Sequence, residues 1–342
     1  MTDPQDRPTP AGPAGARAAE LPVVRLRPHA VLAAAHGGDV LVSASVGPDG
    51  AALVLWATPD DLAALTAQTA QTGWAIFPDP RPPRPVTARV TVHAPETVAV
   101  VHLTELDVTF PELQPLPGGR ILLVGARARW RPDGPDRNAV VYDSDGRPVA
   151  AHILGDGIEH VATTRDGQVW VGYFDEGVYG NFGWGGPDGP PPVGSRGLVR
   201  FSADFEPQWH YPSHVDNLWG AIDDCYALNV ADDAVWTCYY TGFPLVRVRE
   251  DELTGWRNDV AEGARGLVTD GSRVAFLGGH GAEDRLVVGE LVGGRVRRVG
   301  EYRLALPDGG ALPSRARVVG RGPVLHLLDE AGWYRLHLDD LP

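Results

Sequence analysis

Carboxylate and aromatic side chains gather in a few short segments of this chain, and they are the side chains best suited to chemistry. Residues 155–186, GDGIEHVATTRDGQVWVGYFDEGVYGNFGWGG, hold acids, aromatic rings and glycines around a short apolar core. Later segments add the acids of NLWGAIDDC, the tyrosines of YYTGFP and the histidine of GGHGAED. Clustered carboxylates can bind a hard cation through their oxygens, or can raise one another's pKa until one acts as an acid or a base.

These segments supply a set of candidate site residues. The predicted ligand-binding side chains are Glu159, His160, Tyr173, Asp175, Glu176, Trp184, Tyr239, Arg265 and His280. Asp175 and Glu176 are the candidate general bases. Glu159, Asp223 and Asp224 are the candidate ligands of a divalent cation of the Ca²⁺ type. The competing interpretation is that these acids cap turns and pair with the many arginines, as charged turn residues commonly do.

Other reactive arrangements in the sequence are weaker. His210 and His214 lie four residues apart in WHYPSHVDN, but the intervening proline prevents the helix that would align them on one metal. Cys225 and Cys238 fall on successive predicted strands, where reduced thiols commonly serve packing; metal or redox use is the alternative. The glycine-rich GVYGNFGWGG is followed by no helix start and no lysine, so it does not indicate a phosphate site.

Composition excludes several classes of function. The chain has 342 residues, a formal charge of −14 and no basic cluster, which argues against a nucleic-acid or anionic-membrane partner. All 30 basic residues are arginine, so no lysine is available for a Schiff base or a Walker-type phosphate loop. Residues 1–21 are rich in Pro, Ala and Gly, without an apolar run, and predict a disordered tail. We expect a cytoplasmic protein.

A repeated unit predicts how these residues are positioned. A turn that contains Gly or Asp is followed by a short apolar strand at six places in the chain. Helical periodicity is nearly absent. The strands start at Val40, Ile121, Val169, Val235, Val274 and Val324, giving spacings of 81, 48, 66, 39 and 50 residues. We therefore expect an all-β fold over residues 22–342, a single β-propeller of six four-stranded blades. Residues 22–27, PVVRLR, are expected to supply the fourth strand of the last blade.

Two insertions account for the long spacings. In residues 58–85, Thr58 can cap one short helix that starts at Pro59, and a Pro-rich linker should follow. Residues 177–197 form a Gly- and Pro-rich excursion between two strands. In a propeller the loops that join second to third strands emerge on the same face as the connections between blades. The long loops here belong to that face, which we expect to carry the function.

The segment VATTRDGQVWVGYFDEG, residues 161–177, resembles one blade of large propeller groups in which a strand, a DG turn and a W-V-G strand recur. Such phrasing is similar to NHL-like propellers and to six-bladed gluconolactonase-like enzymes. Gluconolactonase-like members hold a divalent cation over the central channel, and the resemblance implies Glu159, Asp175, Asp223 and Asp224 as its ligands here. As a whole the chain resembles actinobacterial propeller proteins, and no tighter family is assigned.

Two functions remain open at this stage. The first is a non-catalytic propeller that binds a small molecule, peptide or protein through its acidic and aromatic loop face. The second is a metal-dependent hydrolase or lactonase, in which a cation polarises a carbonyl and lowers the pKa of a bound water. The sequence favours binding, since it predicts long acidic and aromatic loops on one face and contains no recognisable group of catalytic residues.

Overall fold

Antiparallel strands make up most of the computed structural model, which describes residues 21–70, 76–213 and 217–342. Residues 1–20, almost the whole predicted tail, and His214 lie outside the described residues. Within them the strands fall into runs of four that follow one another along the chain. Neighbouring strands inside each run pair antiparallel, so every run is a meander.

The first three runs occupy the N-terminal half. The first contains β3 (Val40–Val46), β4 (Ala52–Ala57), β7 (Val86–His93) and β8 (Thr97–Leu106). The second contains β9 (Pro111–Leu116), β10 (Arg120–Gly125), β11 (Ala139–Tyr142) and β12 (Pro148–His152). The third contains β13 (Ile158–Thr163), β14 (Val169–Tyr173), β15 (Leu198–Phe201) and β16 (Pro207–His210).

The remaining runs occupy the C-terminal half. The fourth contains β17 (Asp224–Val230), β18 (Val235–Tyr240), β19 (Leu245–Arg249) and β20 (Glu252–Trp256). The fifth contains β21 (Gly266–Thr269), β22 (Arg273–Leu277), β23 (Arg285–Val292) and β24 (Arg295–Ala305). The last contains β25 (Arg317–Arg321), β26 (Val324–Leu328) and β27 (Trp333–His337), before a 3₁₀ turn at Leu338–Asp340.

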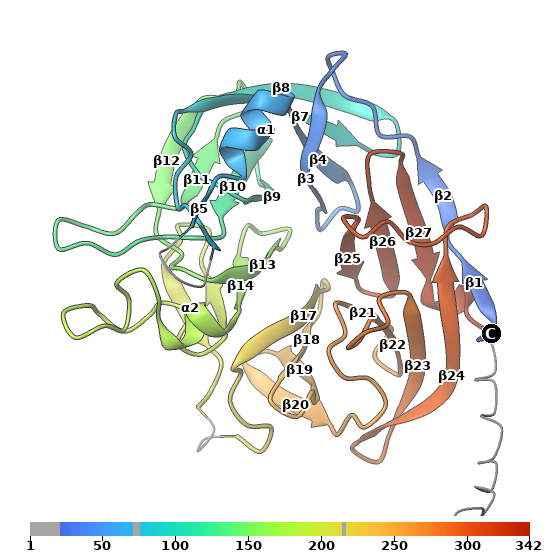
Figure 1. The fold of residues 1–342 in the computed structure, drawn as a ribbon. Helices are drawn as coiled ribbons and strands as arrows, with labels where there is room; N and C mark the ends of the chain where they lie inside the picture. The colour runs from blue at the N-terminus through green and yellow to red at the C-terminus, as the bar shows by residue number, and fades with distance from the viewer. Residues whose placement is uncertain (1–20, 71–75, 214–216) are drawn as a thin grey trace, which may run out of the picture.

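The first strand of every run faces a common centre. Each first strand contacts the first strand of the next run, and β25 contacts β3, so these contacts close into a ring. Figure 1 looks along the axis of this ring, with the later strands of each run lying farther from the middle. The radial arrangement is that of a β-propeller.

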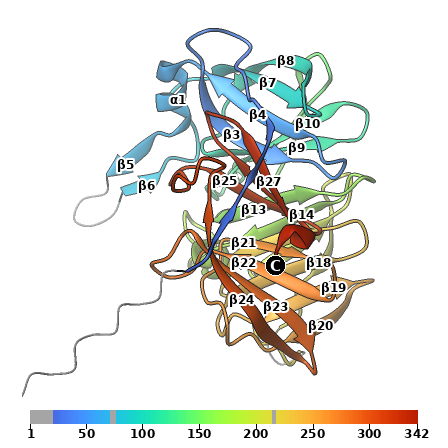
Figure 2. The same cartoon turned by 90° about the vertical axis from the view of Figure 1, so that its right-hand side faces the viewer.

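The N-terminal strands correct one expectation about the last run. Its fourth strand is β2 (Arg27–Ala30), which pairs antiparallel with β27, whereas residues 22–27 were expected there. The strand β1 (Val23–Arg25) lies instead parallel to β24, on the outer edge of the fifth run. Figure 2 shows this N-terminal segment passing across the outside of the molecule. Both outer edges are thus covered by strand pairing, which hides backbone groups that would otherwise be open.

The repeated unit was also misphased in the first run. Val40 begins β3, a first strand, whereas Ile121, Val169, Val235 and Val324 begin or lie at the start of second strands. The second strand of the first run is β4, which follows the turn GPDG. The apparent spacing of 81 residues therefore contained an extra strand as well as the insertion.

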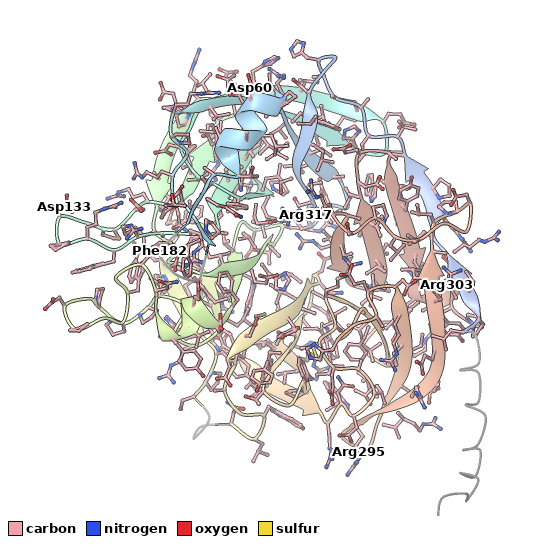
Figure 3. The ribbon with its side chains drawn as sticks, in the orientation of Figure 1. Asp60, Asp133, Phe182, Arg295, Arg303 and Arg317 are labelled. Carbon is pink, nitrogen blue, oxygen red and sulfur yellow. The ribbon has the colours of Figure 1, made fainter. Side chains whose placement is uncertain are left out.

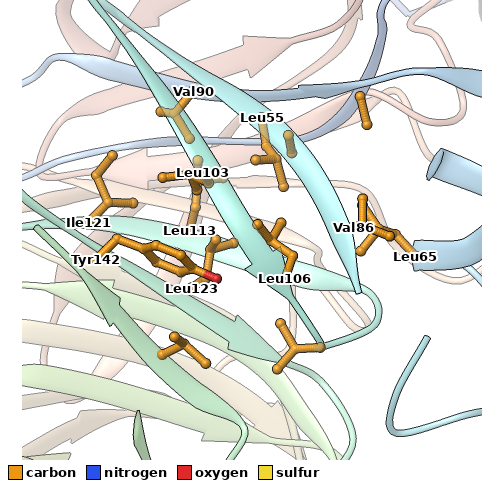
Figure 4. Close-up of a cluster of buried hydrophobic side chains, with 14 of the residues drawn as sticks. Leu55, Leu65, Val86, Val90, Leu103, Leu106, Leu113, Ile121, Leu123 and Tyr142 are labelled. Carbon is orange, nitrogen blue, oxygen red and sulfur yellow. The ribbon is translucent and has the colours of Figure 1, made fainter. Parts of the chain in front are cut away.

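Apolar side chains fill the space between neighbouring runs. In the cluster of Figure 4, Leu55 and Val90 of the first run meet Leu113 and Leu123 of the second. All four are buried, and full burial of such a side chain stabilises the fold by about 1.5–3 kcal/mol. Similar clusters lie at the other run-to-run boundaries, including the one between the last run and the first.

The insertions contain more regular structure than expected. Helix α1 (Pro59–Leu65) starts as predicted, and the Thr58 side chain accepts a hydrogen bond from the Asp61 amide at 3.2 Å. Between α1 and the predicted Pro-rich linker lies a hairpin of β5 (Gln68–Ala70) and β6 (Ile76–Pro78), which reaches the first residues of that linker. A second helix, α2 (Asp175–Tyr179), replaces the expected loop after β14. One helix was expected because five residues carry too little periodicity to indicate another.

Candidate functional site

The two ends of the central channel differ in their loops. At one end, here called the tight-turn end, short turns join first to second strands; they are residues 47–51, 117–119, 164–168, 231–234, 270–272 and 322–323. At the other, the long-loop end, lie the connections between runs and the loops between second and third strands. Figure 2 shows α1 and the hairpin β5–β6 projecting from one side of the molecule. First strands therefore start at the long-loop end and finish at the tight turns.

Arg321 closes the tight-turn end of the channel. Its Nε donates to the Val46 carbonyl at 3.0 Å, and Nη1 donates to the carbonyls of Thr163 and Val230 at 3.0 and 3.2 Å. Its Nη2 donates to Oε1 of Gln114 at 2.8 Å. One guanidinium from the last run thus binds the first strands of four other runs. Burial lowers the pKa of Arg321 to about 10, and no carboxylate in the described ranges forms an ion pair with it.

Asn229 joins the fourth, fifth and last runs at the same end. Its Nδ2 donates to the carbonyls of Leu267 and Gly322, both at 2.8 Å, and its Oδ1 accepts from the Gly322 amide at 2.8 Å. Gly320 lets β25 pass this close, because a Cβ there would lie 2.0 Å from the Leu267 carbonyl oxygen. The side-chain amide of Asn229 therefore uses its hydrogen bonds to hold these runs together.

A cavity of about 700 Å³ lies outside Arg321 at the tight-turn end. Its charged lining is already paired, since Arg165 Nε lies 3.2 Å from Asp232 Oδ1 and the Thr164 hydroxyl donates to Asp166. This cavity is the larger one in volume. Few polar atoms of its charged lining lack a hydrogen-bond or ion-pair partner, so few are available to a ligand.

A second cavity, of about 190 Å³, lies within the channel. Residues of all the first strands, β3, β9, β13, β17, β21 and β25, contribute to its walls. A cavity of this volume suits a compact ligand. Its charged and ionisable lining consists of Glu112, Glu159, His160, Arg265, Arg317 and Arg321.

Glu112 and Arg317 face each other across this cavity. Arg317 Nη1 lies 2.7 Å from Glu112 Oε1, and Figure 3 places Arg317 beside the central opening. Burial raises the pKa of Glu112, and the nearby Arg317 and His160 offset that effect only in part. The pair is therefore one in which a buried carboxylate is incompletely stabilised.

Two further lining residues carry polar atoms without partners. His160 Nε2 and Arg265 Nε are buried and make no hydrogen bond to any residue the structure describes. Arg265 makes one long contact, from Nη2 to the Glu283 carbonyl at 3.4 Å. A buried polar atom without a partner costs about 1–3 kcal/mol, and both atoms are closed to solvent, so a ligand would reach them only if these side chains moved.

Acidic side chains surround the long-loop mouth of the cavity. Burial, followed by repulsion from Glu159 and Asp175, raises the pKa of Asp224 to about 6. No arginine in the described part of the chain forms an ion pair with Glu159, Asp175 or Asp224. Asp223, next in sequence, accepts hydrogen bonds from the hydroxyls of Tyr179 and Thr241, both at 2.5 Å.

Aromatic rings line the same rim. Tyr226 packs edge-on against Phe243 and His280, with ring centroids 5.2 and 6.1 Å apart. Tyr240 contacts Phe243 at 5.8 Å and remains 47% exposed. Along β17, Asp224, Tyr226 and Leu228 are partly exposed whereas Cys225 and Ala227 are buried. Leu228 lines the cavity, so the partly exposed side of β17 leads from the cavity to this rim.

Four of the predicted ligand-binding residues make contacts within the fold instead, and two of them, Tyr173 and Tyr239, are fully buried tyrosines. The Tyr173 hydroxyl donates to the Leu154 carbonyl at 2.5 Å. The Tyr239 hydroxyl lies 2.6 Å from that of Tyr211 and donates to the Trp219 carbonyl at 2.9 Å. Both side chains are fully buried, because at these two positions of β14 and β18 the side chain points between neighbouring runs, whereas that of the adjacent Tyr240 is 47% exposed.

Trp184 and Glu176 fasten the insertion after β14 to the loop after β10. Trp184 Nε1 donates to the Ala128 carbonyl at 2.8 Å, and Glu176 lies 2.5 Å from Arg127 Nη1 as an ion pair. Arg127 also forms a bidentate pair with Asp156 at 2.9 Å and stacks on Phe182. Glu176, a candidate general base, is therefore already neutralised by a buried guanidinium.

The structure brings together Glu159, His160 and Arg265 from the predicted set and adds Glu112 and Arg317, which the sequence analysis missed. His280 lies on the rim, and Asp175 belongs to the acidic group around Asp224. A signal for the missed residues existed, because charged residues interrupt the apolar first strands in PELQPL and RVVGR. A charge on an inner strand of a propeller must face the channel.

The proposed metal ligands do not form a compact donor set. Within the described ranges, no three His, Cys, Asp or Glu side chains come together in a group able to hold a metal ion. Both carboxylate oxygens of Asp223 already accept hydroxyl hydrogen bonds. The residues present therefore do not fit the predicted calcium site.

The two cysteines are free and buried. Cys225 Sγ lies 3.5 Å from the Thr237 hydroxyl, and Cys238 Sγ lies 3.5 Å from the Phe243 carbonyl. Burial raises the pKa of each thiol to about 12, which keeps both protonated near neutral pH. They therefore serve packing. None of the helices in the described residues has the length and apolarity to span a bilayer.

Comparison with known proteins finds structures that are similar to this chain at low sequence identity. The model of the YxzG family matches residues 211–275, a small part of the chain. No curated protein matches. Among solved structures, virginiamycin B lyase from Staphylococcus aureus, a catalytically inactive form with quinupristin, is 11% identical, with a TM-score of 0.39 over 89% of this chain and 97% of that one.

Two further solved structures are similar in extent. A functionally unknown protein from Desulfotomaculum acetoxidans is 11% identical, with a TM-score of 0.45 over 88% of this chain and 83% of that one. A luciferin-regenerating enzyme is 11% identical, with a TM-score of 0.43 over 87% and 92%. At these scores none of the matches transfers an activity to this chain.

Proposed function

We propose that this protein is a six-bladed β-propeller that binds a small polar molecule in its central channel, entering from the long-loop end. The observation that carries the proposal is the cavity of about 190 Å³, lined by every first strand and by charged groups of both signs. Rigid scaffolds commonly present binding groups in this way, with a few polar atoms converging on a concave site.

The blade number rests on strand contacts. Each four-stranded run forms one blade, and contacts between first strands lead from β3 through β9, β13, β17 and β21 to β25 and back to β3. The single parallel bridge between Asn229 and Gly320 joins the fourth run to the last, which merges these two runs into one eight-stranded sheet. We treat them as two blades.

Direction of entry follows from how the two ends are closed. Arg321 and its four acceptors block the tight-turn end, so a ligand reaching the cavity from there would have to break several hydrogen bonds. At the long-loop end, Arg265 and His160 have atoms still lacking partners. Arg265 also has no ion-pair partner among the described residues, so its guanidinium is available to an anionic group of a ligand.

A thermal-shift screen of small polar metabolites tests the proposal. A ligand that binds the folded state alone raises the melting temperature, by an amount set by its concentration relative to Kd. Hits should lose their shift in Arg317→Met and keep it in Arg295→Met, whose arginine is exposed on β24 (Figure 3). Hits that bind equally well to both variants would contradict the channel site.

A further inference from the structure

The charges in the channel are arranged in order along its axis, and this order carries information about the ligand. Arg265 and Arg317 line the cavity itself, whereas Asp224 belongs to the acidic group at the mouth. Resting on the proposed function, we infer that the ligand is a small zwitterion, an amino acid or a betaine, bound with its carboxylate inward and its ammonium outward.

The inner part favours an anion. Arg265 has no ion-pair partner in the described part of the chain, and its Nε is buried without an acceptor. Arginine presents a planar fork of N–H donors that matches a carboxylate. Arg317 is in an ion pair with Glu112, and His160 adds another unpartnered nitrogen. Because Glu112 and Glu159 share the cavity, a dianion such as phosphate would be repelled, so a monoanion fits best.

The outer part favours a cation. Asp224, at the mouth, lies close enough to the cavity-lining Glu159 for the two to repel each other, and neither pairs with an arginine that the structure describes. Tyr226 lies beside them, and its pKa is raised by burial and by Asp224. An ammonium group would neutralise the carboxylates and meet an aromatic face, a combination that proteins use for alkylammonium ligands.

The register of the strands sets the distance between the two parts. The bridge between Asn229 and Gly320 aligns β17 with β25. Arg317 stands three residues from the bridge and Asp224 five, both towards the long-loop end, and a bulge in β17 between Asp224 and Ala227 takes up one of those residues. The two levels therefore differ by about one to two residues, or roughly 3–7 Å along the axis at roughly 3.3 Å per residue. Side chains reach inward from both levels. A molecule whose charges lie a few ångströms apart can therefore satisfy both.

Neither half of such a ligand suits the channel alone. A simple carboxylate would leave the acidic mouth unpaired, and its approach would pass Asp224 and Glu159. A simple ammonium ion would be repelled from the depth of the cavity by Arg265 and Arg317.

Calorimetric titration with 4-aminobutyrate, butyrate and propylammonium at pH 7.5 tests the inference, because the second and third compounds each lack one charge of the first. We expect 4-aminobutyrate to bind at least ten-fold more tightly than either. Glycine betaine and 6-aminohexanoate extend the series to shorter and longer charge separations.

Two variants assign the ends of the ligand. Arg265→Met should weaken 4-aminobutyrate and butyrate at least ten-fold, and propylammonium, which Arg265 repels, should bind as well as before or better. Asp224→Asn should weaken 4-aminobutyrate and propylammonium, and butyrate, which Asp224 repels, should bind as well as before or better. Arg295→Met, on the outer edge of the fifth run, serves as the control.

The outcomes separate this inference from the proposed function. If butyrate or propylammonium binds as tightly as the zwitterions, the ligand class is overturned while a channel site stands. If none of the probes binds, the zwitterion inference is also overturned, and the broader metabolite screen decides the proposed function. Binding of 4-aminobutyrate that neither variant alters would contradict the orientation and place the site elsewhere.

Discussion

The two ends of the central channel use the same kinds of side chain in opposite ways. At the tight-turn end, Arg321 donates to four acceptors on four different runs, and Asn229 makes three hydrogen bonds. At the long-loop end, Arg265 and His160 keep buried atoms without partners, and Asp224 carries an unpaired carboxylate of raised pKa. Polar groups that are satisfied hold the fold, whereas those left unsatisfied are available to a ligand.

The comparison also explains why the larger cavity is the weaker candidate. The space outside Arg321 holds about 700 Å³, but its charged groups pair with each other. The smaller cavity has charges whose partners are missing or incomplete. Charged and polar groups that lack partners therefore indicate the site better than the volume of the cavity does.

The largest effect is expected from Arg321→Met. Removing this guanidinium takes a donor from the carbonyl oxygens of Val46, Thr163 and Val230, each worth about 1–3 kcal/mol. Gln114 Oε1 also loses one donor and keeps two hydrogen bonds from Thr163. We expect the free energy of unfolding to fall by about 4–6 kcal/mol, measured by denaturant titration. Arg165→Met, at the same end but 61% exposed, should cost about 1 kcal/mol or less. Equal losses for both variants would mean that Arg321 does not hold the runs together.

The next largest effect concerns the insertion after β14. Arg127→Met would leave Asp156 buried without its bidentate partner, at a cost of about 3–4 kcal/mol. Helix α2 should loosen as well, because Glu176 also loses its ion pair. Hydrogen exchange would show faster exchange at residues 175–180. Gly157 should be sensitive in the same way, since a Cβ there would lie 2.2 Å from the Gly177 nitrogen.

A smaller effect of opposite sign is expected from Asp224→Asn. Burial and two neighbouring acids raise the pKa of Asp224 from 3.8 to about 6, so the ionised form is disfavoured in the folded state. Its penalty is absent below about pH 4, grows between pH 4 and 6, and is complete above. The substitution should therefore stabilise the protein at pH 7.5 by about 1 kcal/mol, after discounting for solvent screening, and by nothing at pH 3.5.

Thermal melts at the two pH values check this prediction, with Asp133→Asn in the exposed loop of Figure 3 as the control. A loss of stability at pH 7.5 would show that Asp224 already has a cationic partner. In that case the long-loop end, like the tight-turn end, would contain a charged group that is already paired, and the two ends would no longer differ in this respect.

Much of the architecture was predictable from short local signals. Turns such as RDGQ and ADDA precede β14 and β18, and Thr58 with Pro59 marked the start of α1. These signals act within a few residues, so a sequence displays them directly. The placement of β1 and β2 was less visible, because it depends on partners almost three hundred residues away.

The candidate site was only partly predictable. Acids and aromatic residues in long loops indicated the right end of the channel, and they included Glu159, His160 and Arg265. The sequence could not separate these from Tyr173 and Trp184, whose burial depends on which neighbouring run covers them. Arg321 resembles any charged residue before a turn, and its role appears only when carbonyls of distant strands converge on it.

The most direct test of the account is a side-by-side titration of one ligand, the tightest found among the small zwitterions, into three proteins. These are the unchanged chain, Arg265→Met at the long-loop end and Arg165→Met at the tight-turn end. The account predicts at least a ten-fold loss of affinity in Arg265→Met and none in Arg165→Met. Loss of binding in Arg165→Met with full binding in Arg265→Met would place the ligand at the opposite end and contradict the account.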